Sequence, residues 1–285
     1  MRSLIWRGRR RGWRALVIAA LLATVALTGG CAEDTATKPP ARSGEDAVKD
    51  AVDDAQSENG TSSGEASGDR RTDRVLRVDT STPFSYDEYQ RTIGATIGLL
   101  EQYWRQTLPS AFGVPFTPPR GGYKYYRSDR GGGPKCGNEP APPRNAFYCP
   151  VGDFIAWDES GLMIPYYVGG GDFAAAFVLA HEFGHAMQFR LPRKEPLGVL
   201  RELQADCFAG AWARWTADRK LLAGGDLDEA TVAVFAARDV PGTPWTDPNA
   251  HGTGFERTRA FGDGFEAGPK FCYPARASSW VVAPR

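Results

Sequence analysis

Residues 172–189 read DFAAAFVLAHEFGHAMQF, with three glycines directly before them and Pro192 shortly after. Small and apolar residues without a proline favour a helix, and Asp172 is of a type that caps helix N-termini. We therefore expect one helix from Asp172 to about Phe189. Its second half carries the segment His181-Glu182-Phe183-Gly184-His185.

The two histidines of this segment stand four residues apart around a glutamate. Each helical residue turns about 100°, so His181 and His185 project within about 40° of each other and can bind one metal ion. A zinc ion lowers the pKa of its bound water, and Glu182 is placed to accept a proton from that water during attack on a carbonyl carbon. The chain has three histidines in total, so scattered surface histidines are a poor alternative explanation. We expect one Zn²⁺ per chain, with Glu182 as a catalytic residue.

A catalytic zinc ion needs a third protein ligand, and the next predicted helix offers two acids. Glu202 and Asp206 are four residues apart, so they share one helix face, among small residues that permit close packing. Buried acids are costly unless they are paired, and a zinc ion with its histidines would pair them. We assign Glu202 as the third ligand and Asp206 as the acceptor that orients a ligand histidine. A solvated acidic face, or an ion pair with Arg201 or Arg214, is the alternative interpretation.

Other candidate ligands fit this site less well. Glu195 is a rival ligand, but it precedes Pro196 at a predicted helix start, where acids are common as terminal charges. Cys207 lies about 140° around the helix from Glu202, which turns it away from the same ion. No Gly-x-x-His follows the motif, which argues against a three-histidine site. The remaining histidine, His251, precedes a predicted helix N-terminus, and it is either a catalytic donor to the oxyanion or a residue bonded to nearby backbone.

The rest of the folded part combines helix signals with a few short strands. A hydrophobic content of 42% with 24% charged residues is typical of a soluble folded domain. Ser85 and Glu88 form a predicted capping box for an amphipathic helix that we expect to end at Pro109. Further expected elements are strands at 123–127, 146–149 and 153–158, and helices at 197–220, from 226 onward and at 253–268.

Four strings add a resemblance to these separate signals. They are AHEFGH at 180–185, ELQADCFAG at 202–210, AHGT at 250–253 and NAFYCP at 145–150. Together they resemble the bacterial neutral zinc metallopeptidase family, which is gluzincin-like with two histidines and a glutamate on zinc. The resemblance runs from about residue 84 to 272.

This resemblance implies an α+β, zincin-like metallopeptidase fold, with a small N-terminal sheet, an active-site helix and a helical C-terminal lobe. It also implies Glu202 as a metal ligand and Asp206 as its support. Ala186 stands where family members often have a further histidine, and the stretch before His251 is individual to this chain. Both departures concern substrate preference and leave the metal site intact.

The N-terminus has the pattern of a lipoprotein signal. Residues 1–30 contain six arginines and no acid, and the apolar run 15–27 is shorter than the roughly 20 residues that span a bilayer. Small residues then lead to Cys31. We expect a signal peptide at 1–30, lipidation of Cys31, and export to the outer face of the cytoplasmic membrane in the bacterial cell envelope. Ordinary signal cleavage with an incidental Cys31 is the alternative, and both the Sec and the Tat route stay open.

A polar stretch separates this signal from the folded part. Residues 32–69 contain ten acids and three bases but no aromatic residue, Leu, Ile or Met. Such a composition cannot bury enough apolar surface to order the chain. We therefore expect a flexible tether at 31–73 and a zinc metallopeptidase domain at 74–285.

Four cysteines besides Cys31 allow three pairings. A disulfide from Cys136 to Cys149 would close a loop rich in glycine and proline, and one from Cys207 to Cys272 would tie the Glu202 helix to the end of the chain. We prefer these two disulfides, since an exported protein meets oxidising conditions. Four free thiols are the alternative.

These features predict a membrane-tethered zinc endopeptidase that hydrolyses extracytoplasmic proteins or peptides. The alternative is a non-catalytic lipoprotein that keeps the same scaffold and a structural zinc ion for binding or assembly. Glu182 favours the enzyme, because a structural site is closed by four protein ligands, whereas this one has three and an acid placed for catalysis. The 34 basic and 34 acidic residues balance, which argues against a nucleic-acid partner. The expected partners are therefore a protein or peptide substrate and the membrane.

Overall fold

A computed structural model describes residues 84–274 and residue 280. The predictions of a signal peptide at 1–30, lipidation of Cys31, a tether at 31–73 and a domain start at residue 74 lie outside the described residues. Among the helices that the structure describes, none combines the length and the apolar character needed to cross a membrane.

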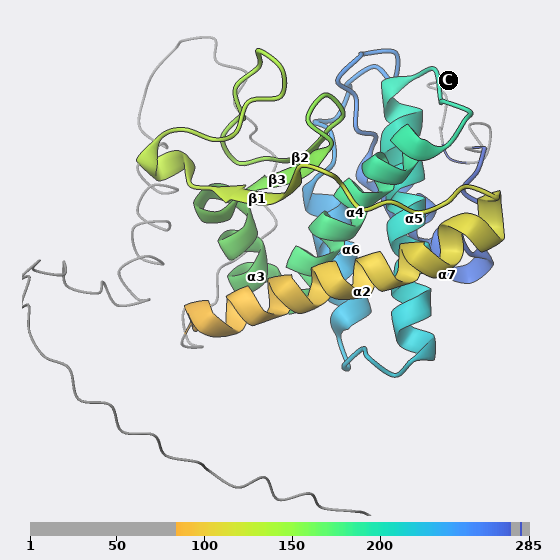
Figure 1. Cartoon of the computed structure of the whole chain (residues 1–285), viewed down its shortest axis with the longest axis horizontal. Helices are drawn as coiled ribbons and strands as arrows, with labels where there is room; N and C mark the ends of the chain where they lie inside the picture. Colours follow the sequence, from red (N-terminus) through yellow and green to blue (C-terminus); the bar gives the residue numbers. More distant parts are fainter. Residues whose placement is uncertain (1–83, 275–279, 281–285) are drawn as a thin grey trace, which may run out of the picture. The chain divides into compact units, whose positions relative to one another are not determined.

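The first helix, α2 (Tyr86–Phe112), crosses the front of the structure in Figure 1. Ser85 caps it as predicted, since its Oγ accepts a hydrogen bond from the N–H of Glu88 at 3.3 Å. The predicted end at Pro109 is wrong, because the helix continues to Phe112 and ends at Gly113, where φ is 69°. Pro109 lies on the exposed face of the last turn, where its ring removes one backbone hydrogen bond and water can reach the freed carbonyl group. The buried face of α2 consists of Tyr89, Ile93, Thr96, Leu100, Tyr103, Trp104 and Leu108.

The three predicted strands exist and form one sheet. Its order is β1 (Gly122–Tyr126), β3 (Phe154–Asp158) and β2 (Ala146–Cys149), with β1 parallel and β2 antiparallel to the central β3. Every residue of β3 is buried, which fits a central strand covered on both faces. The other edge of β2 pairs with no strand in the described part of the chain.

A segment that the sequence did not predict joins β3 to the next long helix. A π-helical turn (Glu159–Met163) leads directly into a short helix, α3 (Ile164–Gly170). Glu159 is fully buried there, and it accepts hydrogen bonds from the Tyr86 hydroxyl at 2.9 Å and the Gln90 side chain at 2.7 Å, both on α2. These long-range partners hold the turn, so its short sequence carries no periodic signal of its own.

Four further helices complete the fold as predicted: α4 (Asp172–Arg190), α5 (Gly198–Asp218), α6 (Asp226–Ala236) and α7 (Gly254–Ala267). The resulting class is α+β, with a small sheet followed by helices. Asp172, however, does not cap α4. The N–H of Phe173 instead donates to Glu229 of α6 at 2.9 Å, and a side chain on Gly171 would collide with that carboxylate. A cap supplied by a distant helix is invisible in the local sequence.

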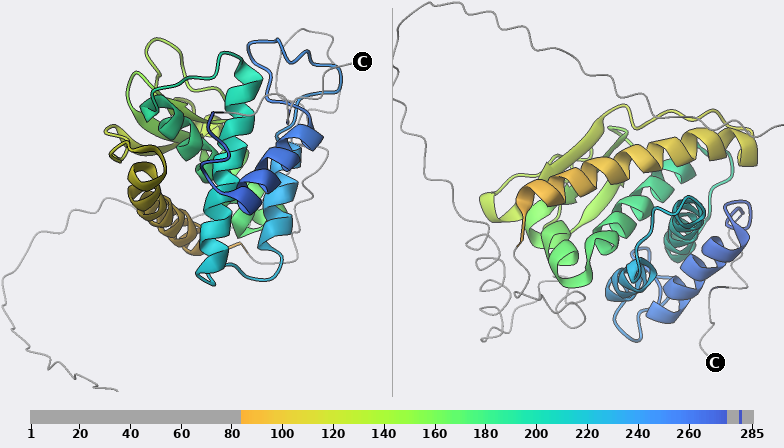
Figure 2. Two further views of the ribbon diagram at one scale, coloured as in Figure 1. Left: turned by 90° about the vertical axis from the view of Figure 1, so that its right-hand side faces the viewer. Right: turned by 90° about the horizontal axis from the view of Figure 1, so that it is seen from below.

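Close helix packing in the C-terminal half depends on glycine. The helices α5 and α7 lie side by side (Figure 2), and a Cβ atom on Gly210 would come within 1.9 Å of the Phe261 carbonyl oxygen. A Cβ atom on Gly264 would likewise come within 1.8 Å of the Cys207 carbonyl oxygen. Each helix therefore meets the backbone of the other at a glycine, where a side chain would not fit.

Both predicted disulfides are present. Cys136–Cys149 closes the loop before β2 with a sequence separation of 13, and Cys207–Cys272 ties α5 to the segment after α7 with a separation of 65. By loop-closure entropy each is worth about 3 to 4 kcal/mol. They hold two regions that little regular structure would otherwise fix.

We predict that Gly264→Ala lowers the free energy of unfolding by at least about 2 kcal/mol, because a methyl group would force α7 away from α5. Gly262→Ala, on the same helix, is the matched control, since nothing lies within 4 Å of its added Cβ. Its better helix propensity should leave stability unchanged or raise it by up to about 1 kcal/mol. Urea unfolding measures both, and equal effects of the two variants would contradict the packing argument.

Candidate metal centre

The position of the metal motif is set by a close contact between α4 and α5. Gly184, within the motif, faces Ala205, and a Cβ atom on Gly184 would approach the Ala205 Cα to 2.9 Å. Only small residues permit this approach. As a result, the face of α4 with His181 and His185 meets the face of α5 with Glu202.

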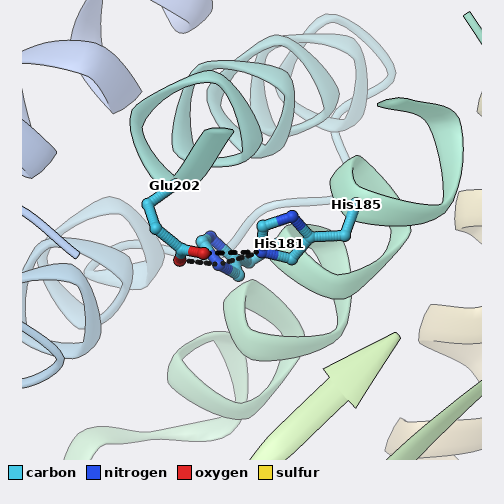
Figure 3. Close-up of side chains that lie close together, drawn as sticks. All are labelled: His181, His185 and Glu202. Carbon is cyan, nitrogen blue, oxygen red and sulfur yellow. Dashed lines mark hydrogen bonds and ion pairs between the residues drawn. The ribbon is translucent and has the colours of Figure 1, made fainter. Parts of the chain in front are cut away.

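Three side chains converge in the space between these helices. Figure 3 shows Glu202 from α5 pointing at His181 and His185 from α4. The Nε2 atoms of the two histidines are 3.1 Å apart, and Glu202 oxygens lie 3.1 Å from His181 Nε2 and 3.4 Å from His185 Nε2. Nitrogen and oxygen ligands of one tetrahedral zinc ion, each about 2.0–2.1 Å from it, lie roughly 3.3 Å from one another. The three donor atoms therefore have the mutual spacing of metal ligands.

The other nitrogen of each histidine has its own acceptor. His181 Nδ1 lies 2.8 Å from Asp206 Oδ1, and His185 Nδ1 lies 3.0 Å from Gln188 Oε1. These partners favour the tautomer in which Nδ1 carries the proton. Both Nε2 lone pairs then face each other, an arrangement that a shared cation stabilises and a hydrogen bond cannot. The residues present thus fit a zinc ion.

Gln188 is a site residue that sequence reasoning missed. Its amide nitrogen donates to the backbone carbonyl of Arg201, so the same side chain contacts the histidine of α4 and the start of α5. The available signal was its spacing, three residues after His185 and hence on the same helix face. Glutamine is common enough on helices that this spacing alone is weak.

Arg257 of α7 is the second missed residue. Its guanidinium group donates twice to Asp206, with both nitrogen–oxygen distances 2.8 Å, and both side chains are almost fully buried. Burial would raise the pKa of Asp206, but Arg257 and His181 lower it. Asp206 therefore stays an anion that can orient His181. Arg257 is 51 residues away in sequence, and no pattern links the two.

The carboxylates of Asp206 and Glu202 favour a positive charge on the neighbouring histidines. Burial alone would lower the pKa of His181, yet Asp206 and then Glu202 raise it to about 10. Burial likewise opposes the charged form of Glu202, but His185 and His181 hold the pKa of that carboxyl group well below its usual range. A metal ion and protons compete for the same histidine lone pairs. A bound cation would therefore balance the negative charge of these carboxylates just as protonation of the histidines does.

Glu182 lies beside the three donors but has a different environment. It is 5% exposed, and its Oε2 has no hydrogen-bond partner among the described residues. Burial raises the pKa of Glu182, opposed by the two histidines and by a hydrogen bond from the backbone of Tyr148 on β2. An unpaired buried carboxylate oxygen is costly in a merely structural role and is common at functional sites.

The site opens on a cavity of about 580 Å³. Part of its lining comes from residues 145–148, which include most of the edge strand β2, and another part comes from residues around the start of α5. His251 and Glu195 both line it, although neither belongs to the group of converging donors. Asp239 fixes His251, accepting from its N–H at 2.8 Å and lying 3.5 Å from its Nδ1.

Two histidines from one helix, a glutamate from the next and a second glutamate at their side define a zincin-type metal centre on an α+β fold. Comparison of the sequence with family models agrees with this class. The family described as "Putative neutral zinc metallopeptidase" matches residues 129–273, about half of the 285-residue chain. The chain belongs to this family, which implies zinc as the metal.

Curated relatives share the same region. The chain is 36% identical over 146 residues to "Uncharacterized protein YpfJ" of Escherichia coli, an alignment that covers 43% of this chain and 50% of YpfJ. It is 29% identical over 214 residues to "Uncharacterized protein Rv2575" of Mycobacterium tuberculosis, covering 64% of this chain and 69% of that protein. The chain thus spans half the length of YpfJ. No solved structure matches it.

We predict that Glu202→Gln lowers zinc affinity at least about 100-fold, because it removes an anionic donor from a three-ligand site. Elemental analysis and competition with a fluorescent zinc chelator measure the effect. Glu195→Gln is the matched control, since it changes a buried acid of the same cavity outside the group of donors, and it should keep one zinc per chain. Full zinc retention by the Glu202 variant, or zinc loss by the Glu195 variant, would exclude this ligand set.

Proposed function

We propose that this protein is a zinc-dependent endopeptidase that hydrolyses extracytoplasmic proteins or peptides. The observation that carries the proposal is Glu182. Its free oxygen lies buried next to three metal-type donors, on the wall of a cavity large enough for part of a peptide.

His181, His185 and Glu202 would hold one zinc ion per chain, with Asp206 and Gln188 fixing the two imidazoles. Zinc in such a site lowers the pKa of a water molecule and polarises a carbonyl group. Three protein donors leave room for water and substrate. A purely structural zinc site would be closed by a fourth protein ligand, which is why the non-catalytic alternative is less well supported.

The edge strand β2 supports an extended peptide as the substrate. Three of its residues, Ala146, Phe147 and Tyr148, line the cavity, and its outer edge pairs with no strand among the described residues. An extended peptide can add to such an edge through main-chain hydrogen bonds, which bind it with little dependence on its side chains. Tyr148 of this strand also contacts Glu182 through its backbone, so a peptide aligned on β2 would lie beside the carboxylate.

Glu182 would accept the proton of the attacking water and then pass it to the leaving amine nitrogen. His251, which lines the same cavity and is oriented by Asp239, would donate a hydrogen bond to the oxyanion of the attacked carbonyl. The amide bond breaks between the carbonyl carbon and this nitrogen. The products are a carboxylic acid and an amine.

We predict that Glu182→Gln keeps zinc and the fold but lowers peptide hydrolysis at least about 1,000-fold, because an amide cannot accept the water proton. Cleavage of denatured casein, followed by mass spectrometry, measures activity, and circular dichroism and elemental analysis measure fold and zinc. Chelation of zinc from the wild-type protein should abolish cleavage, and adding zinc back should restore it.

Two results would contradict the proposal. Cleavage by Glu182→Gln at close to the wild-type rate would exclude Glu182 as the base. No cleavage by the zinc-loaded wild-type protein would favour the non-catalytic alternative. His251→Ala in the same assay separates the two roles of that residue. A catalytic donor predicts unchanged zinc and about 100-fold lower turnover, whereas a structural residue predicts lower stability alone.

We also propose that the mature chain is anchored in the cell envelope by lipid on Cys31. The proposal is supported by the arginine-rich start, the short apolar run and the small residues before this cysteine. One or two acyl chains would provide the attachment. The active site would then face the outer side of the cytoplasmic membrane, together with exported substrates.

We predict that Cys31→Ser moves the protein from the membrane fraction to the soluble fraction after cell lysis, because the acyl attachment point is lost. Immunoblots of both fractions measure the shift. Thr35→Ala, four residues away, is the control and should stay with the membrane. A Cys31→Ser protein still found on membranes would indicate an uncleaved signal or a protein partner in place of lipid.

A further inference from the structure

Outside the metal centre, the cavity is lined by more cationic than anionic side chains. Among the described residues that line it, four are cationic and one is a carboxylate: Arg144, Arg193, Lys194 and Arg201 against Glu195. Arg257 also lines the cavity, but its charge is paired with Asp206. The wall therefore carries a net positive charge, although the whole chain is neutral.

Three of these cations are close in sequence: Arg193 and Lys194 follow the end of α4, and Arg201 lies in the first turn of α5. Arg193, Lys194 and Arg201 are exposed, so they reach the solvent-filled part of the cavity. Arg201 directly precedes Glu202, and Gln188 binds its carbonyl group next to His185. The positive wall is thus adjacent to the metal donors.

Lys194 differs from the two arginines. Its ammonium group donates to three carbonyl groups at the C-terminal end of α4, those of Gln188, Phe189 and Leu191, each at 2.6 Å. It therefore serves partly as a helix cap. Arg201 donates to one carbonyl group, that of Glu195, at 3.2 Å. Arg193 and Arg201 are therefore the better residues with which to test the charge of the cavity.

The metal centre does not cancel this charge. Glu182 and Glu202 bring two negative charges, which a bound zinc ion would offset, and Asp206 is offset by Arg257. A cavity with one sign of charge on walls of low polarity concentrates the field and attracts ligands of the opposite sign.

We propose that this cavity selects peptides that carry Asp or Glu close to the cleaved bond. The inference rests on the proposed endopeptidase function and names its substrate class. Arginine side chains recognise carboxylates through paired hydrogen bonds, and a lysine side chain on the substrate would meet repulsion at the same wall. The positive charge of the wall should therefore both favour acidic peptides and disfavour basic ones.

The test uses three pools of acetylated and amidated octapeptides. All have mixed neutral residues at the four central positions, and the flanking positions carry Glu, Gln or Lys. For the wild-type protein we expect kcat/KM to be about tenfold higher for the Glu pool than for the Gln pool, and lowest for the Lys pool. The preference should shrink as salt is raised, because exposed charges are screened. A fourth pool, neutral but with a free C-terminus, tests whether a terminal carboxylate is recognised instead.

Charge-reversed variants connect the preference to the wall. Arg193→Glu and Arg201→Glu, each checked for zinc content, should lower the Glu-to-Gln ratio several-fold, and the double variant should favour the Lys pool. Arg214→Glu is the matched control. Arg214 is a half-exposed arginine of α5 that pairs with Asp218 and does not line the cavity, so its reversal should leave the ratio unchanged.

A binding measurement separates this proposal from the proposed function. Fluorescence polarisation with labelled Glu, Gln and Lys pools on the Glu182→Gln protein reports recognition without turnover. Tighter binding of the Glu pool would support the inference even if no peptide were cleaved, in which case only the endopeptidase function fails. Cleavage with equal kcat/KM for the Glu and Gln pools, a preference for the free C-terminus alone, or equal effects of Arg193→Glu and Arg214→Glu would overturn it.

Discussion

The contact of α4 with α5 at Gly184 and Ala205 is the constraint on which the metal centre depends. The histidines belong to one helix and Glu202 to the next, so their spacing follows from the distance between two backbones. A methyl group on Gly184 would meet Ala205 at about 3 Å and push the helices apart. Ligand atoms must match metal–ligand distances to within about 0.2 Å, so a small shift of one helix would spoil the site. The glycine in the motif therefore sets the spacing of the candidate ligands, although it is not one of them.

A chain of buried polar groups, which begins at the Nδ1 atom of His181, stabilises this arrangement. His181 contacts Asp206, and Asp206 accepts two hydrogen bonds from Arg257, so α4, α5 and α7 meet through charged side chains in the core. Each group is costly to bury alone, and removing one member of such a network commonly costs about 3 to 5 kcal/mol. The same network needs α7 close to α5, which Gly210 and Gly264 permit. The orientation of His181 therefore depends on the close packing of α5 against α7.

The sheet contributes the opposite wall of the cavity, and a second polar network holds it against α4. Arg190, at the end of α4, donates to Asp153 in the turn between β2 and β3 at 3.0 Å, and the Tyr148 hydroxyl donates to the same carboxylate at 2.8 Å. Hydrogen bonds from the backbone of Arg120 and from the side chains of Tyr148 and Arg190 lower the pKa of Asp153, although burial opposes its charge. Because α4 carries both Glu182 and Arg190, the contact of Arg190 with Asp153 also fixes the position of β2 relative to the candidate base Glu182.

Much of this protein follows from local sequence. The motif helix, the Thr253–Glu256 capping box of α7, the Ser85 cap of α2 and the short strands were predictable, because helix periodicity and end signals involve residues only a few positions apart. The pairing of Glu202 with Asp206 on one helix face follows from the same periodicity. Contacts between distant segments were not predictable: Glu229 capping α4, Arg257 neutralising Asp206, and the π-helical turn held by α2. Pro109 shows the converse, since a strong local stop signal gave way where the helix surface is exposed. Local patterns state which side chains share a face, whereas the packing of the whole core decides which faces meet.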